Sequence, residues 1–262
     1  MLTKNEIISQ LEKFNIPSGK PVIVHSSLKA VGKIDGGAET LLSALIECIT
    51  NRGGLLCIPT HTWIEMSLDL KNPGSSIGAL PDTAAKHPLG IRSLHPTHSI
   101  TVFGEKDRAE KFVEDEAYVD TPVNPEGCYG NIYKEDGYVL LIGVDHTKNT
   151  FLHCIEEMMN VPERLTDEKI ESTIIHKNGN VEKRKLYWFD ESKIPDVSVN
   201  FGKFETAFRH HKCITDGFIG NAPSQLCSAS AMKSVLELIY KNAQGKELLA
   251  DDSPLDNKLY TL

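Results

Sequence analysis

The chain has 262 residues, of which 40% are hydrophobic and 24% are charged, and it is long enough to bury a substantial core. Its formal net charge of −8 argues against a nucleic-acid-binding protein, since such proteins carry a basic face. No apolar run approaches the roughly 20 residues of a membrane span, and residues 1–14 do not resemble a secretory leader. We therefore expect a cytoplasmic protein that binds neither membrane nor nucleic acid. The negative net charge would attract a cationic ligand, but it can equally serve only to keep the protein soluble.

The first sixty residues alternate between helix and strand patterns. A helix is predicted over residues 3–14, with Thr3 as its cap, because apolar side chains recur there at helical spacing. A short apolar strand follows at residues 22–25, then a helix at residues 38–50 and a buried strand at residues 55–58. This alternation is typical of a parallel α/β unit.

The rest of the chain continues as one domain over residues 1–262, since it contains no linker, internal repeat or low-complexity tract. Asn178, Gly179 and Asn180 form a hairpin signal between two strands. The stretches 66–91 and 121–127 are rich in turn residues. Helices are predicted at residues 79–87, 106–113, from about 149, 198–211 and 223–241, and strands at residues 99–103, 138–143, 172–177 and 181–189.

Polar loops follow four apolar segments, and in open α/β sheets the strand ends form the ligand crevice. The loop within residues 22–32 offers backbone N–H groups, hydroxyls and the cation of Lys29, which a phosphate or pyrophosphate needs. It matches neither the GxxxxGK[ST] nor the GxGxxG pattern, so ATP and NAD are disfavoured. An ordinary strand-to-helix connection would explain the same residues.

The second loop covers residues 59–63 and the third covers residues 92–99. Arg92 in the third loop could clamp a phosphate. His95 and His98 are spaced like metal ligands, but no carboxylate lies nearby, so we favour histidines that hold local backbone. The six cysteines form no CxxC pair, which signals neither structural zinc nor a redox pair.

The fourth loop, residues 143–153, carries a histidine into the first turns of a helix. His153 and Glu156 are three residues apart and share a helical face. A histidine oriented by a carboxylate is a common general base, because its pKa lies near neutrality. A histidine in this position can also be purely structural.

Four segments occur together in a characteristic order and spacing: HSSLKAVGKIDGGAETLLSAL, GGLLCIPTHTW, RSLHPTHS and NTFLHCIEE. In this respect the chain resembles the aminoglycoside 3-N-acetyltransferase family over roughly residues 5–240. The resemblance implies one three-layer α/β/α domain with a mixed sheet, unrelated to the GNAT fold. It also implies transfer of acetyl from acetyl-CoA, without a metal, to the 3-amino group of a 2-deoxystreptamine aminoglycoside or a similar cationic amine. Antibiotic resistance would follow, although the physiological role is left open.

The resemblance also assigns roles to individual residues. His153 is implied as the catalytic base, paired with a carboxylate further along the chain, for which Asp190 and Glu191 are the candidates and Glu156 is the local alternative. Arg92 and Ser93 would line the nucleotide side of the cofactor. The residues implied for the pyrophosphate and pantetheine of CoA are His25, Ser26, Ser27, Leu28, Lys29, Val31 and Gly32.

The chain departs from the family in regions that should shape the acceptor pocket. The expected Ser-Pro-Tyr-Gly turn reads Gly-Cys-Tyr-Gly at residues 127–130, and the stretches 105–127 and 191–200 are short and idiosyncratic. The acceptor could therefore be a different amine. Acidic residues that could bind its ammonium groups, or that could simply form solvated helix faces, are Asp82, Glu114, Asp115 and Glu116.

Three alternatives to direct transfer are considered. Cys154 or Cys128 could accept the acetyl group, which would give ping-pong kinetics. A metal-dependent hydrolase could use His61, His95, His98 and His153. A non-catalytic CoA sensor could use the same fold. The oligomeric state is not readable from the sequence.

Overall fold

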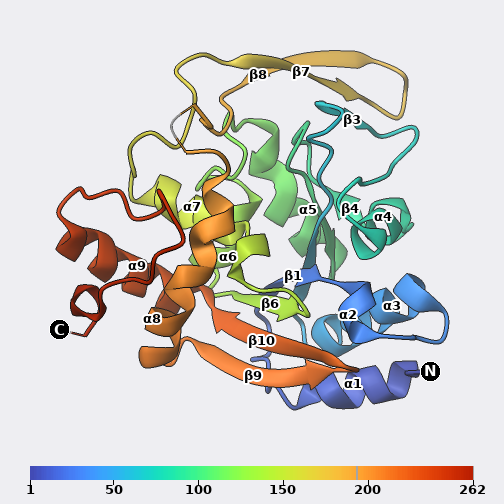
Figure 1. The fold of residues 1–262 in the computed structure, drawn as a ribbon. Coiled ribbons are helices and arrows are strands. Elements are labelled where there is room, and N and C mark those ends of the chain that lie inside the picture. The colour runs from blue at the N-terminus through green and yellow to red at the C-terminus, as the bar shows by residue number, and fades with distance from the viewer. Residues whose placement is uncertain (193, 262) are drawn as a thin grey trace.

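The computed structural model describes residues 1–192 and 194–261 and is built around a mixed seven-stranded sheet (Figure 1). The strand order is β4-β5-β2-β1-β6-β10-β9. The central strands β2, β1 and β6 run parallel, and the flanking strands pair antiparallel. The strands are β1 (Pro21–Ser26), β2 (Leu55–Pro59), β4 (Ile91–Arg92), β5 (Ile100–Phe103), β6 (Tyr138–Ile142), β9 (Ile214–Ile219) and β10 (Ala222–Ser228).

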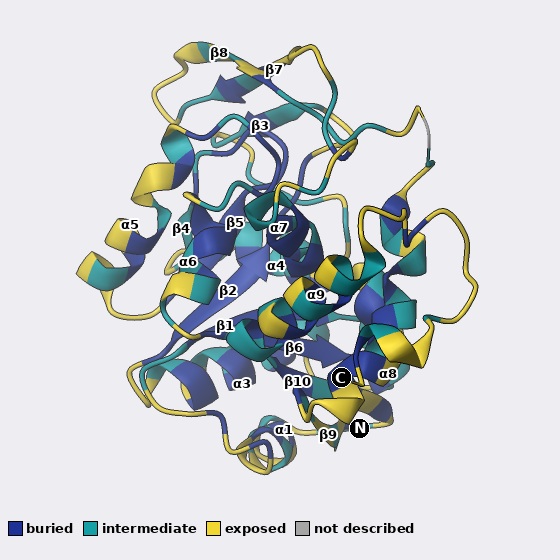
Figure 2. Cartoon of the chain, turned by 90° about the vertical axis from the view of Figure 1, so that its left-hand side faces the viewer, coloured by how far each residue is buried: buried dark blue, intermediate teal, exposed yellow. Residues whose placement is uncertain are grey.

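Side-chain alternation along the strands divides the interior into two cores, one on each face of the sheet. In β1, Val22 and Val24 join one core while Ile23 joins the other. Figure 2 shows the dark, buried sheet between helices that expose their outer faces. The first core is covered by α1 (Lys4–Glu12), α2 (Leu28–Val31), α3 (Gly37–Thr50) and α4 (Ala79–Lys86), and the second by α5 (Lys106–Glu114), α6 (Cys128–Lys134), α7 (Phe151–Met158), α8 (Glu205–His210) and α9 (Ala229–Ala243). The predicted three-layer α/β/α fold with a mixed sheet is confirmed.

A second, three-stranded sheet lies beside the main body at the top of Figure 1. It consists of β3 (Ser67–Asp69), β7 (Ile170–Ile175) and β8 (Val181–Leu186), and β7 and β8 form the predicted hairpin. Arg184 ties this sheet to the body, because its guanidinium donates to the carbonyl oxygens of Leu94 and Val119 at 2.8 and 2.7 Å.

Several predicted elements agree with the structure. Thr3 caps α1 in a capping box with Glu6, and α3, α5 and β6 lie within two residues of their predicted bounds. The short 3-10 helices η1 (Asp115–Ala117), η2 (His146–Lys148), η3 (Val197–Phe204) and η4 (Asn257–Leu259) complete the assignment. Within the described ranges, every helix is too short or too polar to serve as a membrane span.

The C-terminal third contains the main errors of prediction. The helix expected at residues 223–241 begins only at Ala229, because the preceding residues form β10, which pairs with β6. Strand β9 is absent from the predicted elements, and the helix expected at residues 198–211 is η3 followed by α8. The strand expected at residues 181–189 ends at Leu186, and beyond it Phe189 forms an isolated bridge with Leu165.

Candidate active site

A cleft of about 670 Å³ opens at the carboxyl ends of the three central parallel strands. It is lined by His25 and Ser26 at the end of β1, by Pro59 at the end of β2 and His61 after it, and by Val144 after β6. The chain leaves β1 toward β2 on one side and returns to β6 on the other, so the cleft lies where ligands bind in open α/β sheets. Trp63, Trp188, Phe189, Asp190, Glu191 and Asp196 line its walls.

His153, on the first turn of α7, faces this cleft as predicted. Its ring lies between Phe189 and Phe201, with centroid separations of 4.4 and 4.7 Å, and its side chain is 11% exposed. Burial lowers the pKa of His153 to about 4, and the nearby carboxylate of Asp196 opposes that shift. The imidazole is therefore neutral at pH 7 and can accept a proton, but it is a weaker base than the near-neutral histidine that the sequence predicts.

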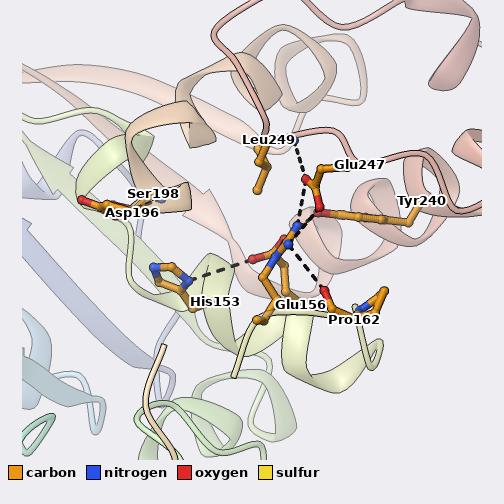
Figure 3. A network of polar contacts seen from close by, with 9 residues as sticks. His153, Glu156, Pro162, Asp196, Ser198, Tyr240, Glu247 and Leu249 are labelled. Carbon is orange, nitrogen blue, oxygen red and sulfur yellow. Dashed lines mark hydrogen bonds and ion pairs between the residues drawn. The ribbon is translucent and has the colours of Figure 1, made fainter. Parts of the chain in front are cut away.

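The carboxylate that contacts His153 is Glu156, whose Oε2 lies 4.0 Å from Nδ1 (Figure 3). The other oxygen, Oε1, accepts from Tyr240 Oη at 2.6 Å and from Arg164 Nε at 2.9 Å. Glu156 is 1% exposed, and burial raises its pKa while Arg164 opposes the shift. This geometry favours the local alternative for the partner of the base.

Asp190 and Glu191, the other predicted partners, both line the cleft. Asp190 accepts from the backbone N–H of Ser192 at 2.9 Å. Asp196 also lines the cleft, and Figure 3 shows it beside the His153 ring. Sequence reasoning misses Asp196, although a signal exists: Asp196 caps η3 by accepting from Ser198 N at 3.1 Å, and Asp-x-Ser at a helix start is typical of such caps.

The predicted cofactor loop splits into two groups. His25, Ser26 and Ser27 line the cleft. His25 Nε2 and Ser26 Oγ are buried and have no hydrogen-bond partner within the described ranges, so both can serve a ligand. Ser27 caps α2 by accepting from Ala30 N at 3.3 Å.

The other residues of this loop support it from outside the cleft lining. Val31 is packed in the core, Leu28 packs against the same core, and Lys29 is exposed. Gly32 has φ +93°, and a Cβ there would lie 2.8 Å from Asn221 Nδ2, so this turn requires glycine.

Arg92 and Ser93 lie outside the cleft lining and hold the loops that form the cleft. Arg92 donates from Nη2 to the carbonyl of Thr60 at 2.5 Å and from Nε to Ser99 Oγ at 3.0 Å. Ser93 is fully buried, and its Oγ accepts from Ile100 N at 2.9 Å. Neither lines the cleft, and their direct contact with a nucleotide stays a prediction.

The loop histidines divide in the same way. His95 uses both ring nitrogens on local backbone: Nε2 donates to Thr121 O at 3.1 Å, and Nδ1 accepts from His98 N at 2.9 Å. His61 and His98 line the cleft, and His61 Nε2 lies 2.8 Å from Tyr129 Oη. In the part of the chain that the structure describes, no three histidine, cysteine or acidic side chains are grouped so that they could hold a metal ion.

The acidic residues expected to bind ammonium groups lie elsewhere. Asp82 pairs with Lys86 at 2.6 Å, while Glu114 and Asp115 are exposed at the end of α5. Glu116 is buried and accepts from Cys128 N at 2.5 Å. None of the four lines the cleft, where Asp190, Glu191 and Asp196 supply the negative charge instead.

The two proposed cysteine nucleophiles are also outside the cleft lining. Cys128 and Cys154 are fully buried, and burial raises the pKa of both thiols well above the ordinary value. A thiolate is the nucleophilic form of cysteine, so neither residue is poised to accept an acetyl group.

Comparison with known sequences identifies relatives of this chain. The sequence model of the aminoglycoside 3-N-acetyltransferase family matches residues 23–240. The chain is 31% identical over 164 residues to aminoglycoside N(3)-acetyltransferase IV of Salmonella sp, a match that covers 61% of this chain and only 60% of that enzyme. It is 22% identical over 271 aligned positions to the aminoglycoside N(3')-acetyltransferase-like protein YokD of Bacillus subtilis (strain 168), covering 94% and 95% of the two chains.

Solved structures share the fold. Aminoglycoside acetyltransferase AAC(3)-IVa, as a histidine-to-alanine variant in complex with a gentamicin, superposes with a TM-score of 0.74 at 24% identity, over 89% of this chain and 86% of that chain. The binary complex of AAC-IIIb with CoASH superposes with a TM-score of 0.73 at 22% identity, over 88% and 93% of the two chains.

Proposed function

The chain belongs to the aminoglycoside 3-N-acetyltransferase family, and from that premise we propose that it transfers acetyl from acetyl-CoA to an amino group of an aminoglycoside or a similar polyamine. The observation that carries the proposal is the neutral imidazole of His153 at a cleft on the strand ends, with Glu156 behind it and Asp196 beside it. This is the arrangement of a general base for a cationic acceptor.

The cofactor end of the cleft is assigned to the end of β1. His25 Nε2 and Ser26 Oγ are the polar atoms that a pantetheine or phosphate group could use there, and a relative of this fold has been solved with CoASH. The rest of the loop would support this end without lining the cleft, through Leu28, Lys29, Val31 and Gly32. Arg92 and Ser93 would support it by holding the neighbouring loops. No metal takes part in this proposal.

The acceptor end is assigned to the wall formed by residues 188–191 and 196–198. Asp190, Glu191 and Asp196 would attract ammonium groups, because carboxylates on one wall of a cleft raise the local concentration of cations. Trp188 adds an apolar surface for a sugar ring. The cleft volume of about 670 Å³ lies within the range of small-molecule sites.

The reaction then follows from proton balance. An acceptor ammonium ion loses one proton to neutral His153, and its lone pair forms a bond to the acetyl carbon while the carbonyl oxygen takes up negative charge. Collapse of this intermediate breaks the carbon–sulfur bond, the CoA thiolate takes the proton back from the imidazolium, and the amide nitrogen releases its second proton to solvent. Glu156 would stabilise the imidazolium between these steps.

A thiol-release assay with acetyl-CoA and a panel of aminoglycosides and polyamines tests this function. His153→Ala should lower kcat by about 10²–10⁴-fold, the usual contribution of a positioned base. His176→Ala is the matched control, since His176 also pairs with a glutamate, Glu182 at 2.8 Å, but lies outside the cleft lining. Near-normal turnover of the His153 variant would show that the base is assigned wrongly, and CoA binding without thiol release would identify a sensor.

We further propose that residues 1–262 act as one domain in the cytoplasm, with a small cationic molecule and no nucleic acid or membrane as partner. The net charge of −8 supports the absence of a nucleic-acid partner. Both cores pack on the same sheet, and Glu247 near the C-terminus contacts Arg164 after α7, which supports a single domain.

A further inference from the structure

Hydrogen bonds connect Glu156, the carboxylate next to His153, to the chain segment that follows α9. Arg164 is 8% exposed and donates from Nε to Glu156 Oε1 at 2.9 Å. Its two terminal nitrogens, Nη1 and Nη2, contact Oε2 and Oε1 of Glu247 at 3.0 and 3.1 Å. Glu247 also accepts from the backbone N–H of Leu249 at 2.7 Å (Figure 3). One guanidinium therefore bridges two carboxylates, and only Glu156 contacts the base.

The charges in this network oppose one another. A carboxylate as buried as Glu156 would take up a proton if it were alone, and Arg164 opposes that by favouring the ionised form. The same guanidinium lowers the pKa of His153. Glu247 pairs with the terminal nitrogens of Arg164, and its own charge raises the pKa of Glu156. Glu247 therefore acts in favour of Glu156 through the orientation of the guanidinium.

The geometry leaves one atom of the network available to the base. Glu156 Oε1 is held by Tyr240 and Arg164, whereas Oε2 faces His153 Nδ1 at 4.0 Å and has no hydrogen-bond partner within the described ranges. A bidentate pair between Arg164 and Glu247 fixes the orientation of the guanidinium plane, which in turn fixes Glu156.

We propose that Glu247, acting through Arg164, is a positioning residue that keeps Glu156 aimed at Nδ1 of His153. This inference rests on the proposed function, because it assigns Glu247 to the same proton transfer. Glu247 lies outside residues 23–240, the part of the chain that the family model matches, so the assignment concerns a feature that the family match does not cover.

The remaining titratable groups near His153 lie on other elements. Asp196 precedes η3, and His61 and His98 belong to the loops after β2 and before β5. Within the described ranges Glu247 pairs with Arg164 and with the Leu249 backbone, and with none of these side chains. We therefore expect its effect on His153 to pass through Arg164 and Glu156.

Glu247→Gln tests the proposal, because it removes one charge while it keeps an oxygen for Arg164. We expect kcat to fall by roughly tenfold, less than the loss of the base itself, with KM for acetyl-CoA within about twofold. In NMR titrations of histidine-labelled protein without ligands, the pKa of His153 should fall by roughly half a unit. This is less than the 1–3 units of a charge in direct contact, because Glu247 acts through Arg164.

Two further variants define the cause. Asp216→Asn is the matched control: Asp216 also forms a bidentate pair with an arginine, Arg209 at 2.7 and 2.9 Å, but on β9 and outside the cleft lining. It should change neither kcat nor the pKa of His153. Glu247→Asp keeps the charge, so kcat and the pKa of His153 should stay close to those of the wild type. It also provides a second test if the glutamine variant does not fold.

The outcomes separate this inference from the proposed function. If Glu247→Gln keeps kcat within twofold and the pKa of His153 unchanged while the wild type is active, the positioning role is wrong and the transferase assignment stands. Equal losses in the Asp and Gln variants would also overturn the inference, because the charge would then not matter. If the wild type releases no thiol with any amine, the proposed function fails, and the NMR comparison alone still decides whether Glu247 acts on His153.

Discussion

Glu116 is a buried carboxyl group whose charge should make the stability of the protein depend on pH. It lies in η1 with a side chain 1% exposed, and its Oε2 accepts from the backbone N–H of Cys128 at 2.5 Å. Its Oε1 has no hydrogen-bond partner in the portion of the chain that is described. Burial, opposed by the hydrogen bond from Cys128, raises the pKa of Glu116 to about 7 from an ordinary value of 4.5.

The consequence for folding follows from proton linkage. Between pH 4.5 and 7 the folded state keeps a proton that the unfolded state releases, so this group stabilises the fold fully below pH 4.5. That stabilisation is lost as the pH rises through 7. The shift from 4.5 to about 7 corresponds to about 3 kcal/mol of the free energy of unfolding, since one pKa unit is worth about 1.4 kcal/mol.

Glu116→Gln isolates this contribution, because glutamine resembles the protonated carboxyl group and does not titrate. Urea unfolding of both proteins from pH 4 to pH 8 measures the difference in free energy of unfolding at each pH. The wild type should lose about 3 kcal/mol relative to the variant as the pH rises over this range. A difference that stays constant across the range would show that Glu116 does not change its protonation there, and the reasoning from burial would be refuted.

Three other substitutions, one of them a control, test the packing of the fold and the role of a buried thiol. Gly130→Ala should destabilise the protein by about 3 kcal/mol or more in urea unfolding, since a Cβ there would lie 1.6 Å from the carbonyl oxygen of Pro125. Gly202→Ala, where the nearest atom would be 3.7 Å away, is the control that should change stability by less than about 1 kcal/mol. Cys154→Ala should lower the melting temperature but leave kcat within about twofold, because that thiol is buried and is not needed for direct transfer. Loss of turnover with a retained fold would instead support a cysteine nucleophile.

The elements that the sequence predicts well carry their signal locally. The helix pattern of α3 and the cap of α1 depend on residues within one or two turns, and the apolar run of β6 is bounded by polar residues. The pattern wrongly favours a helix across strand β10, because Leu226 and Cys227 precede a true helix without a break. The extended form of β10 is stabilised by pairing with β6, a contact more than eighty residues away in the chain.

The same distinction explains which parts of the site could be predicted. His153 and Glu156 are visible in the sequence because three residues on a helix place two side chains on one face. Asp190 and Glu191 are reached through the family resemblance, whereas Asp196 reaches the cleft only because the chain turns at that residue, with φ 43°.

The contact between Arg164 and Glu247 spans 83 residues, and no short pattern announces it. Both side chains look like solvated charges on loops when they are read in sequence. Only the fold shows that Arg164 is nearly buried between two carboxylates, and a buried cation must be paired to be tolerated. The environment of the base is therefore determined by tertiary packing, even where the base itself is evident from the sequence.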